Sequence, residues 1–190
     1  MSDPILPLGG ASFDGLVSLR EVVPQGWVSI RGDLSDQAIR DAVAGATLMA
    51  LPGTRGVASD GDARLLWMAP DELAWLLPRP DAAGAADALA DRLAAHHALV
   101  LDASDARAHF QLTGAPGAVR EVLGKLAPVD LSPDAFPPMT LRRTRMAQMA
   151  AGVWFETAGP ARVFCFRSVA RYGFDLLCTA AAPHSAVGYY

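Results

Sequence analysis

The chain has 190 residues, 52% of them hydrophobic and 19% charged, so we expect it to fold around a core and not to remain disordered. Its formal net charge of −4 argues against nonspecific binding to nucleic acid or to anionic membranes, which favour basic surfaces. No apolar run approaches the roughly 20 residues that a membrane span needs. Two cysteines, Cys165 and Cys178, are too few for a disulfide framework, and we expect both to be buried free thiols.

The N-terminal residues 1–14 are rich in Pro and Gly and predict an extended arm, either disordered or laid along a partner. A charged segment followed by an apolar one is missing there, so we expect no signal peptide and a cytoplasmic protein. Residues 15–23 and 27–32 read as two strands. A helix follows them, capped by Asp33 or Ser35.

The first half of the chain continues with a Gly-rich loop over residues 51–62. Two apolar runs, 64–69 and 72–77, are separated by a short Pro-Asp step and predict an antiparallel hairpin. Asp81 can cap a second helix, and residues 97–102 predict a strand after it.

The second half begins with the stretch 101–123, which predicts a strand, a tight turn and a helix. Ala108, Phe110 and Leu112 alternate with polar residues as in a half-buried strand. Pro116 suits the first turn of a helix because its missing N–H would have had no partner there. The remaining elements are an irregular connection over 127–138, strands over 140–150, 153–157 and 162–166 with breaks at Gly152 and Gly159, and a last helix from about Ser168 that would bury Tyr172.

The two halves match in outline. The segment WVSIRGDLSDQAIRDAV resembles HFQLTGAPGAVREVL, with Gly32 opposite Gly114, and similar elements follow each of them. This order predicts an α+β fold of two ferredoxin-like (split βαβ) halves, with antiparallel sheets covered by helices. The expected organisation is an arm over 1–14, a first half over 15–103, a second half over 104–181 and a loose tail over 182–190.

Sequence motifs for catalysis are missing: there is no G-x-S-x-G, Walker A lysine, H-E-x-x-H or C-x-x-C. The four histidines, His96, His97, His109 and His184, lack neighbours at the usual spacing of metal ligands. We interpret His96 and His97 as the polar end of a helix. The sequence therefore predicts no catalytic, cofactor-binding or metal-binding residue in this chain.

Three charged residues invite two interpretations. Asp102 or Asp105 could bind the amine or pterin edge of a ligand; alternatively, both belong to a self-capping turn that pairs with Arg107, which is the commoner arrangement between strands. The segment 114–117 also fits the G-x-x-G loop of some RNA-binding modules. That interpretation is disfavoured, because the only nearby cation is Arg120 and the chain is acidic.

The only basic cluster consists of Arg142, Arg143 and Arg145 on a predicted strand. These side chains could protect a sheet edge from aggregation or dock against an acidic partner, and both interpretations stay open. The four tryptophans all lie in predicted strands, where we expect core or subunit-interface positions and not a cofactor pocket: Trp27, Trp67, Trp75 and Trp154.

Three segments carry a resemblance to a known family: LWMAPDELAWLLP, VLDASDARAHFQLTGAPGAVREVL, and PVDLSPDAFPP followed by an Arg-bearing strand. Together, over about residues 17–179, they resemble the aminomethyltransferase (glycine-cleavage T protein) and YgfZ folate-binding superfamily. Within it the pattern is most similar to gamma subunits of heterotetrameric sarcosine oxidase.

The resemblance implies a non-catalytic structural subunit. Enzymes of that family demethylate sarcosine oxidatively to glycine, with FAD, FMN and NAD in the larger subunits and tetrahydrofolate as acceptor. The implied partners are the alpha subunit and, through it, the beta and delta subunits. The alternative is a stand-alone folate-binding protein of the YgfZ kind, with Asp102 or Asp105 on the pterin.

Overall fold

The computed structural model describes residues 5–23 and 25–190, and the chain divides into two compact units. Residues Gln25–Asp105 form the central unit. The described residues before 24, together with Ala106–Tyr190, form the terminal unit. The first four residues of the expected N-terminal arm lie outside the described residues. Within residues 5–23 and 25–190, no helix has the length and apolar character needed to cross a membrane.

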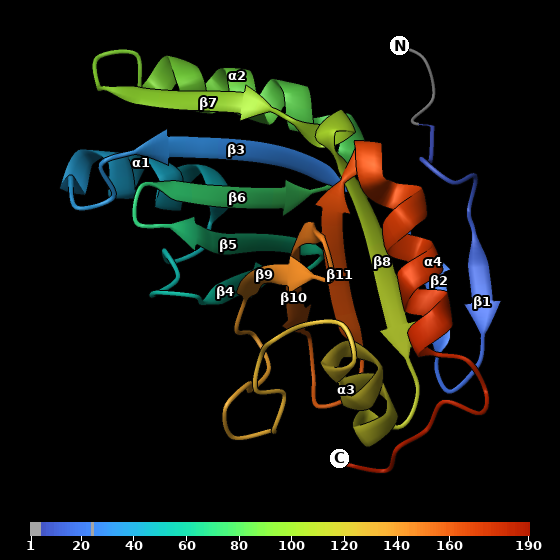
Figure 1. Ribbon diagram of the computed structural model, residues 1–190. Coiled ribbons are helices and arrows are strands. Elements are labelled where there is room, and N and C mark those ends of the chain that lie inside the picture. Colours follow the sequence, from blue (N-terminus) through green and yellow to red (C-terminus); the bar gives the residue numbers. More distant parts are fainter. Residues whose placement is uncertain (1–4, 24) are drawn as a thin grey trace. The chain divides into compact units, whose positions relative to one another are not determined.

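The central unit is a five-stranded antiparallel sheet with helices packed against it (Figure 1). Its strands are ordered β4-β5-β6-β3-β7. In chain order its elements are β3 (Gly26–Gly32), α1 (Gln37–Thr47), β4 (Val57–Asp60), β5 (Ala63–Ala69), β6 (Glu72–Leu77), the short η1 (Arg79–Asp81), α2 (Ala82–Arg92), β7 (Ala98–Asp102) and η2 (Ser104–Ala106).

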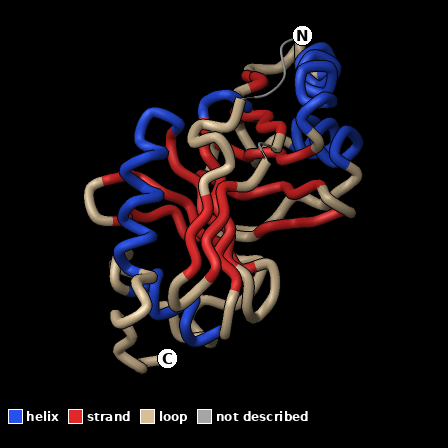
Figure 2. The backbone as a smooth tube through the Cα atoms, turned by 90° about the vertical axis from the view of Figure 1, so that its right-hand side faces the viewer, coloured by secondary structure: helices blue, strands red, loops and turns tan. Residues whose placement is uncertain are grey.

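The terminal unit is a six-stranded antiparallel sheet ordered β1-β2-β8-β11-β10-β9. Figure 2 shows helices (blue) lying along the strands (red). The elements are β1 (Ser12–Asp14), β2 (Ser18–Glu21), β8 (Arg107–Thr113), α3 (Pro116–Gly124), β9 (Arg142–Met146), β10 (Met149–Phe155), β11 (Ala161–Phe166), the short η3 (Arg167–Val169) and α4 (Ala170–Ala180).

The two units repeat one topology, which confirms the predicted fold class. The central order β4-β5-β6-β3-β7 corresponds strand for strand to β9-β10-β11-β8-β2 in the terminal unit. In both units the repeat begins with a strand and a helix, and three strands and a second helix follow them. This is the split βαβ order. The closing strand of the terminal unit, β2, comes from the beginning of the chain, whereas β7 follows its own helix.

Alternating residues of each sheet build its core beneath the helices. On β8 the buried apolar residues are Ala108, Phe110 and Leu112, as the alternation predicted. They pack in one cluster with apolar residues of α3 and α4, among them Val119, Val122, Leu123, Phe174 and Leu177. The central unit has a separate cluster of its own, which includes Val28, Ile30, Ile39, Val43, Leu65, Leu73, Leu89 and Leu93.

Several predicted boundaries are wrong in detail. Helix α1 is capped by Asp36, whose carboxylate accepts the Ala38 N–H at 2.8 Å, and not by Asp33 or Ser35. The expected loop 51–62 contains β4, a short polar strand with little hydrophobic signal. Gly152 does not interrupt a strand but lies inside β10.

The predicted inner face of the last helix is also wrong at Tyr172. Helix α4 buries Gly173 and Phe174, while the Tyr172 side chain is exposed. The sequence placed Tyr172 inward because its spacing from Leu176 fits a helical stripe, and only the packing shows which stripe meets the sheet.

The chain ends are built into the terminal unit. Residues 15–23, expected in the first half, include β2, which pairs with β8. The described part of the arm adds β1 beside β2, so it lies along the chain's own sheet. The expected half boundary at 103/104 falls beside the observed one at Asp105.

Candidate functional site

Asp102 and Asp105 are engaged in local contacts in the central unit. Asp102 ends β7, and its carboxylate accepts the Ser104 backbone N–H at 3.0 Å and the Ser104 hydroxyl. The Ser104 Oγ in turn accepts the Trp27 N–H at 2.8 Å. Asp105 pairs with Arg79 at 2.8 Å, a partner that the sequence did not indicate. These contacts support the interpretation of a self-capping turn.

Arg107 opens β8, and its guanidinium lies 4.0 Å from the centre of the Phe166 ring, a cation–π contact between neighbouring strands. Its predicted pairing with the aspartates stays a prediction. Two residues along, His109 is buried, and burial lowers the pKa of its imidazole to about 4, with smaller contributions from Arg162 and Arg107. The His109 imidazole is therefore neutral at pH 7.

The histidines and cysteines that could ligate a metal ion do not form a cluster among the described residues. His96 Nδ1 lies 3.6 Å from the Asp36 carboxylate, near the end of α2 as expected. Among the residues that the structure describes, no three His, Cys, Asp or Glu side chains are placed to hold a metal ion. Both cysteines are free, and burial raises the pKa of the Cys165 thiol to about 11. Cys178 is only partly buried, where full burial was expected.

The glycine turn before α3 is occupied by the chain itself. Pro116 begins the helix as predicted. A Cβ at Gly117 would lie 2.6 Å from the Tyr190 carbonyl oxygen, so the end of the chain rests on this turn. Arg120, the cation needed for a phosphate clamp, is buried and donates to the carbonyls of Leu131 and Phe136. The RNA-loop interpretation therefore lacks its positive charge.

The basic cluster lies on β9, at one edge of the six-stranded sheet. Arg142 donates to the Ala135 carbonyl at 2.5 Å, and Arg145 donates to the Gln148 side chain at 2.8 Å. The edge position fits both interpretations given above, edge protection and docking. Among the tryptophans, core positions are confirmed for Trp27, Trp75 and Trp154, which are buried, whereas Trp67 is partly buried.

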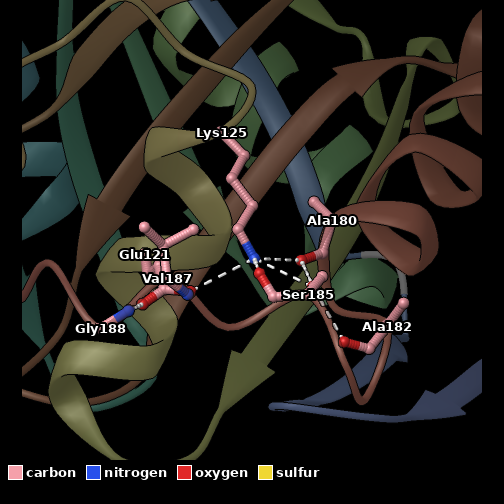
Figure 3. Close-up of polar contacts among 7 residues, drawn as sticks. All are labelled: Glu121, Lys125, Ala180, Ala182, Ser185, Val187 and Gly188. Carbon is pink, nitrogen blue, oxygen red and sulfur yellow. Dashed lines mark hydrogen bonds and ion pairs between the residues drawn. The ribbon is translucent and has the colours of Figure 1, made fainter.

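Sequence reasoning missed two carboxylates that hold the chain ends. Glu21 accepts the N–H groups of Leu8 at 2.9 Å and Gly10 at 2.8 Å. Glu121 accepts those of Val187 and Gly188, each at 2.6 Å (Figure 3). These donors hold the pKa of the Glu121 carboxyl below its usual value. The only signal in the sequence for either glutamate was that it shares a face with apolar residues of its strand or helix, where a carboxylate needs hydrogen-bond donors.

Lys125 completes this second anchor. Its Nζ donates to the carbonyls of Ala180 at 3.0 Å and Ser185 at 2.5 Å, and lies 3.3 Å from Glu121 (Figure 3). The tail 182–190 has no regular secondary structure, yet it is fastened to α3 and is not loose as predicted. Glu121 and Lys125 thus serve to order the backbone of the tail.

A family model for the gamma subunit of sarcosine oxidase matches residues 31–183. A chain of the heterotetrameric sarcosine oxidase from Corynebacterium sp. U-96, solved with pyrrole 2-carboxylate, is 28% identical, with a TM-score of 0.80 over 92% of this chain and 88% of that one. The glycine cleavage aminomethyltransferase T of Bartonella henselae shares the fold at 12% identity, with a TM-score of 0.58 over 83% of this chain and 44% of that one. No curated protein matches by sequence.

Proposed function

The chain belongs to the sarcosine oxidase gamma subunit family, and from this premise we propose that it is a non-catalytic structural subunit of a heterotetrameric sarcosine oxidase. The match over residues 31–183 carries the proposal. In the proposed complex, the larger subunits demethylate sarcosine to glycine and bind FAD, FMN and NAD. The complex also uses tetrahydrofolate.

The contacts of the polar residues support a structural role. Asp102 is bonded to Ser104, Arg120 to backbone carbonyls, and Glu121 to the tail. Asp102 thus orders its own turn, whereas Arg120 and Glu121 each fasten α3 to another segment of the chain. An acid, a base and a nucleophile within reach of each other, the usual geometry of a catalytic site, are not brought together by these contacts.

The partners proposed are the alpha subunit and, through it, the beta and delta subunits. The structural match to a chain of a heterotetrameric enzyme supports partners of this kind. The test is co-expression of an affinity-tagged chain with the other subunits of a sarcosine oxidase. We expect a yellow, flavin-containing complex that oxidises sarcosine. Active enzyme that forms without this chain, while the chain elutes alone, would refute the proposal.

Stand-alone folate binding of the YgfZ kind is less favoured by these contacts. The carboxylates available for a pterin are Asp102, already bonded to Ser104, and Asp105, paired with Arg79. Calorimetric titration of the full chain with tetrahydrofolate separates the two functions. We expect no saturable heat, whereas one-to-one binding would favour the folate-binding alternative.

A further inference from the structure

Strand β7 is an edge strand of the central sheet, with α2 packed against one of its faces. Its one strand neighbour among the described residues is β3. The Ala103 N–H donates to the Trp27 carbonyl at 2.7 Å, which sets the alternation of the ladder. Leu99 and Leu101 then exchange hydrogen bonds with β3, while the N–H and C=O groups of Val100 and Asp102 point away from the sheet. A row of outward groups of this kind is a template for pairing with another extended strand.

The terminal unit shows what occupies the same position there. Its strand β2 corresponds to β7, since β2 closes the repeated order beside β8 as β7 does beside β3. The outer side of β2 is paired antiparallel with β1, in the register Ser12 to Arg20. The central unit supplies no strand equivalent to β1 among its described residues.

The other sheet edges carry the usual protection against a further strand. Strand β9 bears three arginines, β1 has three residues, and β4 ends in the exposed Ser59 and Asp60. Strand β7 has five residues and a single charge at its end, and the Asp102 carboxylate is turned back onto Ser104.

The side chains of β7 add an apolar surface to this open edge. Leu99 and Leu101 lie on the same face of the strand and are 50% and 49% exposed. Both are large aliphatic residues with half of their surface in water, beside backbone groups ready to pair. Such a surface favours an apolar strand over a charged or helical partner.

We propose that β7 is a docking edge for an extended, apolar strand of another subunit of the oxidase complex, which pairs antiparallel with it and covers Leu99 and Leu101. This inference rests on the proposed function, of which it names the contact surface. A second copy of the chain is disfavoured, because one five-residue pairing buries on the order of a few hundred Å², well below the about 1,200 Å² of stable interfaces. A strand that belongs to another subunit does not need to reach this area by itself, because further contacts hold that subunit in the complex.

The test uses the co-expressed complex with a tagged full chain. We expect the double variant Leu99→Lys/Leu101→Lys to recover about tenfold less partner subunit, the loss typical of removing an interface anchor. Val100→Pro should act similarly, because it removes an outward N–H that β3 does not use. Tyr172→Lys is the matched control: Tyr172 is an exposed apolar residue on α4, and the variant should recover partners normally. Thermal unfolding of each variant establishes that it folds.

Hydrogen exchange supplies a backbone readout. The amides of Val100 and Asp102 should exchange quickly in the full chain alone and be protected in the complex. Equal recovery by all variants, or unchanged exchange at β7, overturns the docking edge while the proposed function stands. A wild-type chain that recovers no partner refutes the proposed function itself. A dimer of the chain alone that the Leu99→Lys/Leu101→Lys variant dissolves would assign β7 to a second copy and overturn the proposal.

Discussion

At the scale of single residues, the two carboxylates in the turn after β7 contribute unequally to the stability of the fold. Asp102 organises a chain of hydrogen bonds through Ser104 to the backbone of Trp27. Asp105 makes an ion pair with Arg79 while 76% of its side chain is exposed. Exposed pairs of this kind contribute little to folding because water and salt screen them.

Substitution should separate these two aspartates. We expect Asp102→Ala to lower the free energy of unfolding by about 1 kcal/mol, since it removes the acceptor that orders the turn. Asp105→Ala should cost less than about 0.5 kcal/mol, as is typical of exposed ion pairs. Urea unfolding of both variants measures the difference. An equal loss for the two would mean that the Arg79 pair holds the turn instead.

His109 should make stability depend on pH. Its imidazole has a pKa of about 4 in the folded chain, against 6.5 for an ordinary histidine, because it is buried. At a pH between these two pKa values, the unfolded chain binds a proton at this histidine that the folded chain does not bind. The free energy of unfolding therefore keeps the whole contribution of this group above pH 6.5 and falls as the pH drops toward 4. The loss attributable to this group approaches about 3 kcal/mol at the lower end.

The measurement is urea unfolding from pH 7.5 to 4.5 for the wild-type chain and for His109→Gln. The variant has no titrating group at this position, so its stability should fall less steeply over that range. Parallel curves for the two proteins would show that other groups, and not His109, dominate the pH dependence.

At the scale of elements, the interior of β10 depends on a glycine for space and not for a turn. A Cβ at Gly152 would lie 2.1 Å from the Phe164 ring of the neighbouring β11. Phe164 crosses the strand at this point, and no ordinary side chain fits beneath its ring. The sequence suggested a strand break because glycine is rare inside strands, whereas close approach is the other reason for finding it there.

Gly152→Ala should therefore lower the free energy of unfolding by about 1–3 kcal/mol through overpacking. Gly84, inside α2, is the matched control, because no heavy atom of the described residues lies within 4 Å of a Cβ built there. Gly84→Ala should raise stability by about 0.5–1 kcal/mol through its better helix propensity. Thermal unfolding of both variants tests the pair. A Gly152→Ala chain as stable as wild type would mean that the Phe164 ring moves aside at little cost.

At the scale of the whole molecule, one topology occurs twice with different closing strands. The terminal unit draws β2 and β1 from the start of the chain, whereas in the central unit no strand of the described residues pairs with the outer side of β7. This difference is the structural basis of the docking edge. It is consistent with the structural role proposed above, and its test is the recovery of partner subunits in the co-expression experiment. The predicted cytoplasmic location stays a prediction.

Much of the fold could be predicted from the sequence, because local patterns decide it. The alternation in 107–113, the proline that opens α3 and the Pro-Asp step of the hairpin each have a short-range physical cause. The resemblance between the segments around Gly32 and Gly114 was enough to predict the duplicated α+β fold. The family, too, was recognisable from motifs in their order.

Long-range contacts were beyond the reach of local patterns. Glu121 and Val187, which are far apart in the sequence, meet only when α4 has turned the chain back over α3. The same holds for β2, which local signals placed with its sequence neighbours but which pairs with β8. The sequence by itself determined most of the elements and the repeat, since propensity and periodicity act within a few residues. Only the tertiary structure decided which carboxylates fasten the ends and which strand stays open, because burial and pairing depend on residues that the chain brings together from a distance.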